Sequence, residues 1–225
     1  MSVRRTRAEV VAEIERTGVV AVMRLDDASA GRDVAHALAD GGLTALEVTM
    51  TVPGAIGLIE ELAATLPPAC VLGAGTVLDG ATARDVIRAG AAFVVSPVLQ
   101  PHVISVCRDA DVAVVPGCFT PTEILSASTA GADVVKVFPA TSLGPSFIRD
   151  LRGPLPHLKL MPTGGVTRQN AGDWIRAGAV AIGVGTALID VQAVRERRFD
   201  ILTGAARHFI RAVADARSTP VGVRP

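Results

Sequence analysis

Short apolar runs recur along the chain and alternate with longer stretches in which apolar residues return every three or four positions. The runs have the length of buried β-strands, and their β-branched residues favour that structure. The spacing in the intervening stretches is typical of amphipathic helices. A short helix over residues 6–17 is predicted to come first and to end before Gly18. The eight predicted strands begin at Val19, Ala45, Val71, Phe93, Val112, Val134, Leu158 and Val180.

This alternation of strand and helix continues without a linker or a change of composition. We therefore expect an α/β fold with a single domain over residues 1–225, a (β/α)₈ or TIM barrel in which residues 217–225 form a frayed tail. The competing architecture is a doubly wound open sheet. Its dinucleotide-binding signature is weak here, because the run GAGTVLD from Gly73 has Leu78 where the third glycine should stand.

Composition narrows the class of partner. Lys and Arg total 22, as do Asp and Glu, and aromatic residues make up 3% of the chain, so neither a basic stripe nor a base-stacking platform for nucleic acid is expected. Three cysteines without C-x-x-C spacing fit a reducing compartment. No run of about eighteen uncharged apolar residues suggests a membrane span. We expect a cytoplasmic protein with no membrane partner.

The run DVVKVFPA, residues 133–140, places a lysine inside an apolar strand. Side chains alternate along a strand, so Lys136 shares one face with Val134 and Phe138. Burial disfavours the ammonium form, and a neutral amine attacks carbonyl carbon to form a Schiff base. The alternative is a structural lysine at the strand end that reaches water.

Glu47, in the run LEVTM, is a second charged residue among apolar strand residues. A buried carboxylate is costly unless it is paired or functional. It could form an ion pair with Arg24 or Lys136 that only stabilises the fold, or it could act as a general acid and base. Both interpretations stay open, and an interior lysine with an interior carboxylate suits an enzyme that forms an imine.

Glycine turns follow the last two predicted strands. Thr163 leads into Gly164 and Gly165, and Gly185 with Thr186 follows the eighth strand. In barrels this region often binds phosphate through backbone N–H groups. The pair of turns indicates a phosphorylated or otherwise anionic ligand, although each turn alone could be plain loop geometry.

Two further donors stand at strand ends. Arg24 ends the first strand and Thr76 the third, and both could hold a carboxylate. The alternatives are a solvated charge for Arg24 and a helix cap for Thr76. The four histidines lie outside the predicted strands, and none is paired with a Cys, Asp or Glu at zinc spacing. We expect no metal and no cofactor.

These residues resemble a known family, the 2-keto-3-deoxy-6-phosphogluconate (KDPG) aldolases and the related 4-hydroxy-2-oxoglutarate (KHG) aldolases. The resemblance runs in order across residues 18–190. Its matching segments are LEVTM from Leu46, GAGTVL from Gly73, VSP from Val95, PGCFTPTE from Pro116, VVKVFPA from Val134, MPTGGV from Met161 and GVGTAL from Gly183.

The resemblance implies a (β/α)₈ barrel, a homotrimer, and a metal-independent Schiff-base aldolase that acts on a small 2-keto acid, phosphorylated in the KDPG case. It also implies a role for each matching residue. Lys136 would form the imine and Glu47 would be the acid and base, with Thr76 holding the pyruvyl carboxylate, Pro97 and Phe138 lining the pocket, and Gly164, Gly165 and Thr186, with the adjoining Gly185, binding the distal phosphate.

One position departs from the family pattern. KDPG aldolases commonly have arginine four residues after the strand-borne glutamate, where this chain has Thr51. It carries Arg24 instead, as the 2-keto-3-deoxy-6-phosphogalactonate (KDPGal) aldolases do. The expected substrate is KDPG, and KHG in addition, with KDPGal as the alternative. A sugar-phosphate isomerase or epimerase and a non-catalytic anion-binding barrel are the rival functions.

Overall fold

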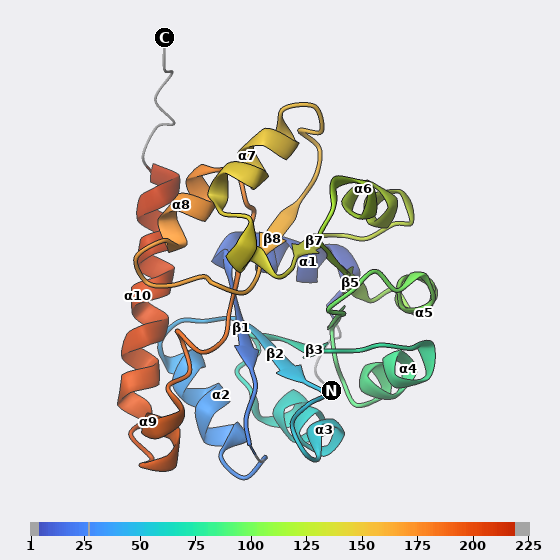
Figure 1. The fold of residues 1–225 in the computed structure, drawn as a ribbon. Helices are drawn as coiled ribbons and strands as arrows, with labels where there is room; N and C mark the ends of the chain where they lie inside the picture. The colour runs from blue at the N-terminus through green and yellow to red at the C-terminus, as the bar shows by residue number, and fades with distance from the viewer. Residues whose placement is uncertain (1–4, 27, 219–225) are drawn as a thin grey trace.

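The computed structural model describes residues 5–26 and 28–218 (Figure 1). Its helices are α1 (Arg7–Thr17), α2 (Gly31–Asp40), α3 (Ala55–Thr65), α4 (Gly80–Arg88), α5 (Pro101–Asp109), α6 (Pro121–Thr129), the 3₁₀ helix η1 (Ala140–Ser142), α7 (Pro145–Arg152), α8 (Ala171–Arg176), α9 (Val191–Arg195) and α10 (Phe199–Ser218). Its strands are β1 (Val19–Met23), β2 (Ala45–Thr49), β3 (Val71–Gly75), β4 (Phe93–Val95), β5 (Ala113–Val115), β6 (Gly117–Cys118), β7 (Val135–Val137), β8 (Leu160–Pro162) and β9 (Ile182–Val184).

The expected closed eight-stranded barrel is wrong. Hydrogen bonds divide the strands between a six-stranded parallel sheet, in the order β5-β4-β3-β2-β1-β9, and a three-stranded parallel sheet, β6-β7-β8. The larger sheet curls into a half-barrel, and helices surround the strands in Figure 1. The α/β class and the sequence of strands and helices were predicted correctly, but the ladder is not continuous.

Two breaks in the ladder account for the division. The fifth predicted strand splits into β5 and β6 at Pro116, which has no N–H to donate, although its carbonyl accepts from the amide of Lys136 at 2.9 Å. On the other side, β8 and β9 are joined by a single bridge between Thr163 and Gly183. A prediction from apolar runs alone cannot locate such breaks.

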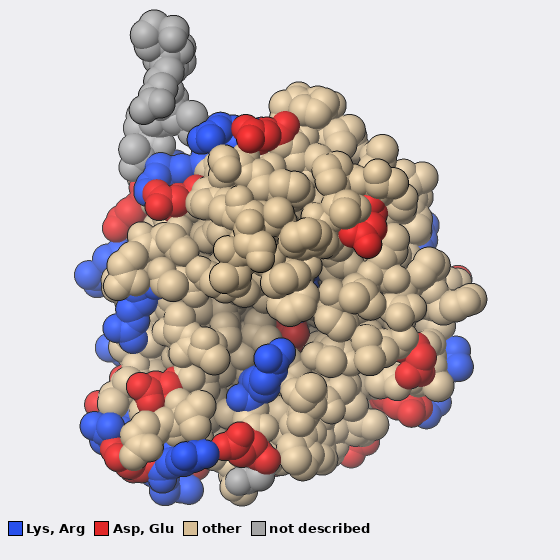
Figure 2. Space-filling model, viewed as in Figure 1, with Lys and Arg blue, Asp and Glu red and all other residues tan. Residues whose placement is uncertain are grey.

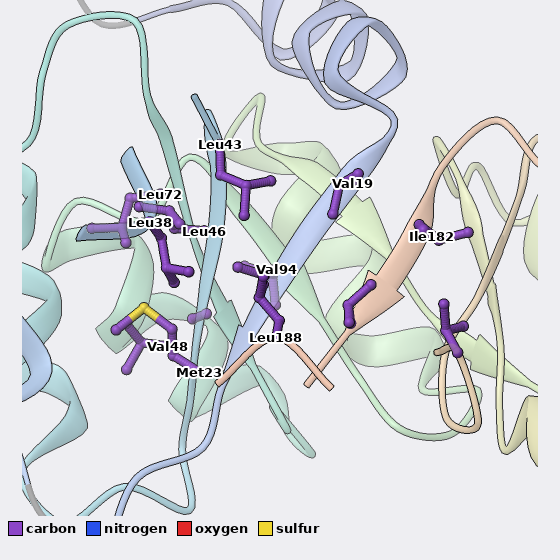
Figure 3. Close-up of a cluster of buried hydrophobic side chains, with 14 of the residues drawn as sticks. Val19, Met23, Leu38, Leu43, Leu46, Val48, Leu72, Val94, Ile182 and Leu188 are labelled. Carbon is purple, nitrogen blue, oxygen red and sulfur yellow. The ribbon is translucent and has the colours of Figure 1, made fainter. Parts of the chain in front are cut away.

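Strand residues point alternately to two separate cores. The inner core collects residues near the strand beginnings, among them Val20, Ala45, Val71 and Phe93. The outer core lies between the strands and the surrounding helices, and Figure 3 shows part of it, with Met23 beside Val48 and with Val19 and Ile182 on their strands.

Helix α1 packs against the inner core through Val10, Val11 and Ile14, and so covers the amino ends of the strands. Thr6 and Glu9 form a capping box at its start, and Gly18, in the left-handed region at φ 66°, ends it. The predicted helix over residues 6–17 is thereby confirmed. With this end covered, the opposite ends of the strands are left for a site.

The chain closes with α10, which packs against α2 and α8 (Figure 1). The predicted tail begins within this helix, since α10 extends to Ser218 and residues 219–225 lie outside the described residues. Arg217 donates hydrogen bonds to the carbonyls of Glu15, Arg16 and Val180. In the part of the chain that the structure describes, no helix is long and apolar enough to cross a membrane.

Candidate active site

Lys136 stands in the middle of β7, and its strand neighbours place it at the interior of the fold. Its register partners are Gly117 on β6 and Met161 on β8. Only 5% of the residue is exposed, so the interpretation as a solvated strand-end lysine does not hold. The Nζ atom lies 4.9 Å from the centre of the Phe138 ring, two residues further along the same face, as the alternation predicts.

Glu47 lies in the middle of β2 and is 1% exposed. Both of its carboxylate oxygens are buried without a hydrogen-bond partner, and neither a hydrogen bond nor a salt bridge joins it to Lys136 or Arg24 in the described chain. The structural ion pair considered from sequence is therefore not present. A buried, unsatisfied carboxylate is expensive, which is typical of a group kept for chemistry.

Gly75, at the end of β3, makes room for this carboxylate. A Cβ atom at position 75 would overlap Oε1 and Cδ of Glu47. The sequence analysis did not identify Gly75 as part of the site. Its position in the buried run GAG was the available indication, because glycine inside a strand often marks close approach of another group.

Burial shifts the pKa values of Glu47 and Lys136 so that the neutral form of each side chain is favoured. Burial raises the pKa of Glu47, and the positive charges of Lys136 and Arg24 counter this only in part. Burial also lowers the pKa of Lys136, against the effect of Glu47 and with a smaller contribution from Arg24. A carboxyl group that can hold a proton and an amine that can lose one are what acid–base and nucleophilic steps require.

The two glycine turns come together in one pocket with a volume of about 140 Å³. It is lined by seven of the predicted residues, Arg24, Phe138, Thr163, Gly164, Gly165, Gly185 and Thr186, together with Val22, Val166 and Gly183. Thr163 is 6% exposed, and its buried Oγ1 has no hydrogen-bond partner. Figure 2 shows one face of the molecule, which is hollowed near the centre of the view, where a basic and an acidic side chain lie close together.

The first glycine turn is held in a defined conformation. Gly164 and Gly165 adopt φ values of 87° and 73°, which favour glycine. The carbonyl of Gly165 accepts a hydrogen bond of 2.9 Å from the side-chain amide of Asn170. No hydrogen bond from the amide of Gly165 to another described residue is present. The turn thus offers a free backbone donor of the kind that binds anions.

The second turn has the same character. The carbonyl of Gly185 accepts from the amides of Leu188 and Ile189, at 2.9 and 3.0 Å. The amides of Gly185 and Thr186 themselves donate to no other described residue. Each turn therefore uses its carbonyl internally and leaves donors at the pocket.

Thr76 and Pro97 stand at the ends of β3 and β4 and do not line that pocket. Thr76 follows Gly75 with φ 59°, an unusual value for a β-branched residue and one found at constrained sites. The helix-cap interpretation does not apply, because Asp79 caps α4. The carbonyl of Pro97 lies against Gly117, the register partner of Lys136.

Other chemistry finds little support in the described residues. They contain no cluster of three or more His, Cys, Asp or Glu side chains able to hold a metal ion. All three cysteines are free, and burial raises the pKa of the Cys107 and Cys118 thiols to about 12, which disfavours a thiolate nucleophile.

The fold brings a buried lysine and a buried carboxylate to the same end of the strands as a pocket lined by glycine turns, an arrangement suited to an enzyme. The model of the KDPG and KHG aldolase family matches residues 10–204. This chain belongs to that family, and it is an aldolase, a lyase acting on carbon–carbon bonds.

Individual relatives agree with the family assignment. The chain is 36% identical to a probable 2-dehydro-3-deoxy-6-phosphogalactonate aldolase of Rhizobium meliloti, over 76% of this chain and 81% of the relative. It is 32% identical to a 2-dehydro-3-deoxy-phosphogluconate aldolase of Haemophilus influenzae, over 91% of this chain and 97% of the relative. Among solved structures, a KDPG aldolase of Legionella pneumophila with pyruvate captured as a covalent carbinolamine matches with a TM-score of 0.81 and 27% identity, over 88% of this chain and 96% of that one.

Proposed function

We propose that this protein is a metal-independent class I aldolase that cleaves KDPG to pyruvate and glyceraldehyde 3-phosphate. The observation that carries the proposal is the buried Lys136 beside the buried, unpaired carboxylate of Glu47. The covalent pyruvate adduct in the Legionella pneumophila relative supports covalent catalysis. An isomerase or epimerase of sugar phosphates, or a barrel that only binds anions, has no need of this pair.

The proposed reaction begins when the neutral amine of Lys136 attacks the C2 ketone of the substrate. The resulting carbinolamine loses water and gives a cationic iminium, which accepts electrons. Glu47, directly or through a water, removes the proton of the C4 hydroxyl group. The C3–C4 bond breaks, its electrons form an enamine, and C4 leaves as the aldehyde.

The second half of the reaction restores the enzyme. Glu47 returns a proton to C3 of the enamine, which regenerates the iminium. Water then adds to C2 and releases pyruvate with the free amine of Lys136. The raised pKa of Glu47 suits a group that accepts and donates a proton in one cycle.

The remaining predicted residues would bind the substrate around this pair. Thr76 is proposed to hold the pyruvyl carboxylate, and Pro97 and Phe138 to line the pocket beside the reacting carbons. The distal phosphate would lie at the two glycine turns, which place Thr163, Gly164, Gly165, Gly185 and Thr186 together.

A second substrate is favoured by two observations. Thr51 replaces the arginine of the KDPG pattern, and the relative from Rhizobium meliloti carries the galactonate name. KDPGal differs from KDPG in configuration at C4 and yields the same two products. KHG, which would give pyruvate and glyoxylate, is a third substrate to compare.

The decisive experiment is incubation with pyruvate and sodium borohydride, followed by intact mass and peptide mapping. The chain contains only two lysines, Lys136 and Lys159, which makes the mapping simple. We expect a reduced pyruvyl adduct on Lys136 that Lys136→Ala abolishes and Lys159→Ala leaves in place. Wild-type turnover by Lys136→Ala would contradict the mechanism.

The substrate and the assembly need separate measurements. Pyruvate release from KDPG, KDPGal and KHG, compared as kcat/KM, ranks the substrates. We also propose a homotrimer, in keeping with the family resemblance, and another relative was used in a cage designed by fusing symmetric oligomeric domains. Light scattering that gives the mass of one chain rather than three would contradict the trimer.

A further inference from the structure

We propose that Thr49 and Thr51 form a hydrogen-bonded relay that positions Arg24 at the substrate pocket. The inference rests on the proposed function and adds two positioning residues to it, neither of which the sequence analysis placed in the site. It follows from the hydrogen bonds at the end of β2, from the number of protons that the two hydroxyl groups hold, and from the way in which β1 ends.

A side-chain hydrogen bond joins the end of β2 to the end of β1, the neighbouring strand in Figure 1. Thr49, the last residue of β2, is 1% exposed, and its hydroxyl group donates a hydrogen bond of 3.2 Å to the carbonyl of Met23. That carbonyl and the amide of Arg24 belong to one planar peptide unit. Thr49 therefore fixes the orientation of the peptide unit from which Arg24 leaves the strand.

Backbone pairing of β1 ends where this bond acts. The register of β1 with β9 ends at Ala21 and the register with β2 ends at Met23, so Arg24 lies beyond both ladders. The Arg24 side chain is exposed and forms no hydrogen bond or ion pair with another described residue. It nevertheless lines the pocket of the two glycine turns. The Thr49 hydroxyl group thus supports Arg24 at the point where the sheet no longer does.

The second threonine sets the direction of the relay. The Oγ1 atoms of Thr49 and Thr51 are 2.8 Å apart. Each hydroxyl group holds one proton, and Thr49 donates its proton to Met23, so Thr51 is the donor in the bond between the two threonines. With Thr51 donating to its oxygen, the Thr49 hydroxyl group keeps its proton on the carbonyl of Met23. Thr51, which departs from the family pattern, thereby has a role beside the site.

Thr49→Val tests the relay, because valine has nearly the shape of threonine and lacks the hydroxyl group. We expect KM for the phosphorylated 2-keto acid that the wild type cleaves best to rise roughly 3- to 10-fold, the range for loss of one hydrogen bond. We expect kcat to stay within about twofold, because the contacts of Lys136 and Glu47 are unchanged. A fall in kcat at constant KM would place the effect on Glu47, on the same strand, and would overturn the inference.

A double-mutant cycle with Arg24→Gln shows whether Thr49 acts through Arg24. In the Arg24→Gln background, Thr49→Val should change KM by less than about twofold, because the side chain that it positions is already absent. Two single effects that multiply in the double variant would make the residues independent and overturn the inference. An unchanged KM in Arg24→Gln alone would also overturn it, since the relay would then position nothing that the substrate uses.

Variants of Thr51 extend the test to the exposed end of the relay. Thr51→Val should raise KM about threefold, because the Thr49 hydroxyl group is then free to turn away from Met23. Thr51→Ser restores the hydroxyl group and should return KM to the wild-type value. Because Thr51 is exposed, this pair decides the question even where Thr49→Val does not fold. Equal KM values for Thr51→Val and Thr51→Ser would overturn the inference.

Thr203→Val is the matched control. The Thr203 hydroxyl group, on α10, also donates to a carbonyl of another element, that of Ala37 on α2, at 2.8 Å. Thr203 does not line the pocket of the glycine turns, so its substitution should lower stability and leave KM unchanged. Equal changes of KM in Thr49→Val and Thr203→Val would show that loss of a hydrogen bond anywhere in the fold has this effect, and would overturn the inference.

The same measurements distinguish failure of the relay from failure of the proposed function. A wild-type protein that neither cleaves a phosphorylated 2-keto acid nor traps pyruvate on Lys136 would contradict the proposed function, and the relay with it. A wild-type protein that does both, with threonine variants that match it in KM, would overturn the relay alone.

Discussion

Polar side chains at the amino ends and at the carboxyl ends of the strands differ in whether they form hydrogen bonds within the protein. At the amino ends, Asp133 accepts hydrogen bonds from Arg7 at 2.8 and 2.9 Å and from the amide of Val114 at 2.9 Å. At the carboxyl ends, the oxygens of Glu47 and Oγ1 of Thr163 are buried without partners. The hydrogen bonds of Asp133 add stability, whereas the unsatisfied oxygens of Glu47 and Thr163 cost stability.

The covering of each end shows the same contrast. Helix α1 seals the amino ends with apolar residues, a capping box and the hydrogen bonds of Arg217 to its last carbonyls. The carboxyl ends carry glycine turns with free amides and an open pocket. Substitutions at the two ends should therefore change different properties, and this can be measured.

The largest effect is expected from Glu47→Gln. The amide keeps the shape of the side chain but cannot take or return a proton, so kcat should fall roughly 10²- to 10⁴-fold. Because Lys136 is intact, pyruvate should still be trapped by borohydride. Glu61→Gln, an exposed carboxylate paired with Arg32 at 3.6 Å, is the control and should leave kcat unchanged. Full turnover by Glu47→Gln would remove the acid–base role.

Asp133→Ala should produce the opposite pattern at the amino ends. The Asp133 and Arg7 side chains are 13% and 22% exposed. Truncation leaves the partly buried guanidinium of Arg7 with only its hydrogen bond to the carbonyl of Gly131, and it removes the acceptor of the Val114 amide. We expect the free energy of unfolding to fall by about 3 kcal/mol in urea titrations, with kcat unchanged. Asp150→Ala removes an exposed ion pair and should change stability little. A loss of activity without a loss of stability would contradict the comparison.

Replacing both buried site residues, as Glu47→Gln with Lys136→Met, should raise stability while abolishing activity. Burial raises the pKa of Glu47, so the fold favours the neutral carboxyl group. As pH rises through the folded-state pKa the group ionises, and the protein loses the stability that the neutral form gave. Burial lowers the pKa of Lys136, so the fold favours the neutral amine. As pH falls through the folded-state pKa of Lys136 the amine is protonated, and the protein loses the stability that the neutral form gave. Both costs apply together near neutral pH, where the double variant should gain about 2 kcal/mol.

The pH dependence of that gain is a further check. Below the ordinary carboxyl pKa only the cost of Lys136 remains, and above the ordinary amine pKa only that of Glu47 remains. The difference in melting temperature between the double variant and the wild type should therefore narrow towards both extremes. A double variant that is less stable at neutral pH would show that the pair stabilises the fold.

The burial of the two charged residues was easier to predict from sequence than the sheet that holds them. Lys136 and Glu47 each interrupt an apolar strand with a charge, and alternation along the strand fixes the face they share with Val134 and Ala45. These are local signals, visible within a few residues of one strand.

The missing information is non-local. Closure of the sheet depends on hydrogen bonds between strands far apart in the chain, and Pro116 and the single bridge at Thr163 interrupt the ladder. Apolar periodicity carries no information on this pairing.

The smallest expected effects come from two matched glycine substitutions. In Gly75→Ala, the new Cβ would overlap the carboxylate of Glu47, so we expect a loss of about 1 to 2 kcal/mol in stability and a lower kcat as Glu47 shifts. In Gly57→Ala, on α3, no described atom beyond the adjoining residues and the helix's own backbone lies within 4 Å of the new Cβ, and stability should rise by about 0.5 to 1 kcal/mol. The same chemical change would then have opposite signs at the site and on a helix surface. Equal effects from the two variants would show that Gly75 is not needed to accommodate Glu47.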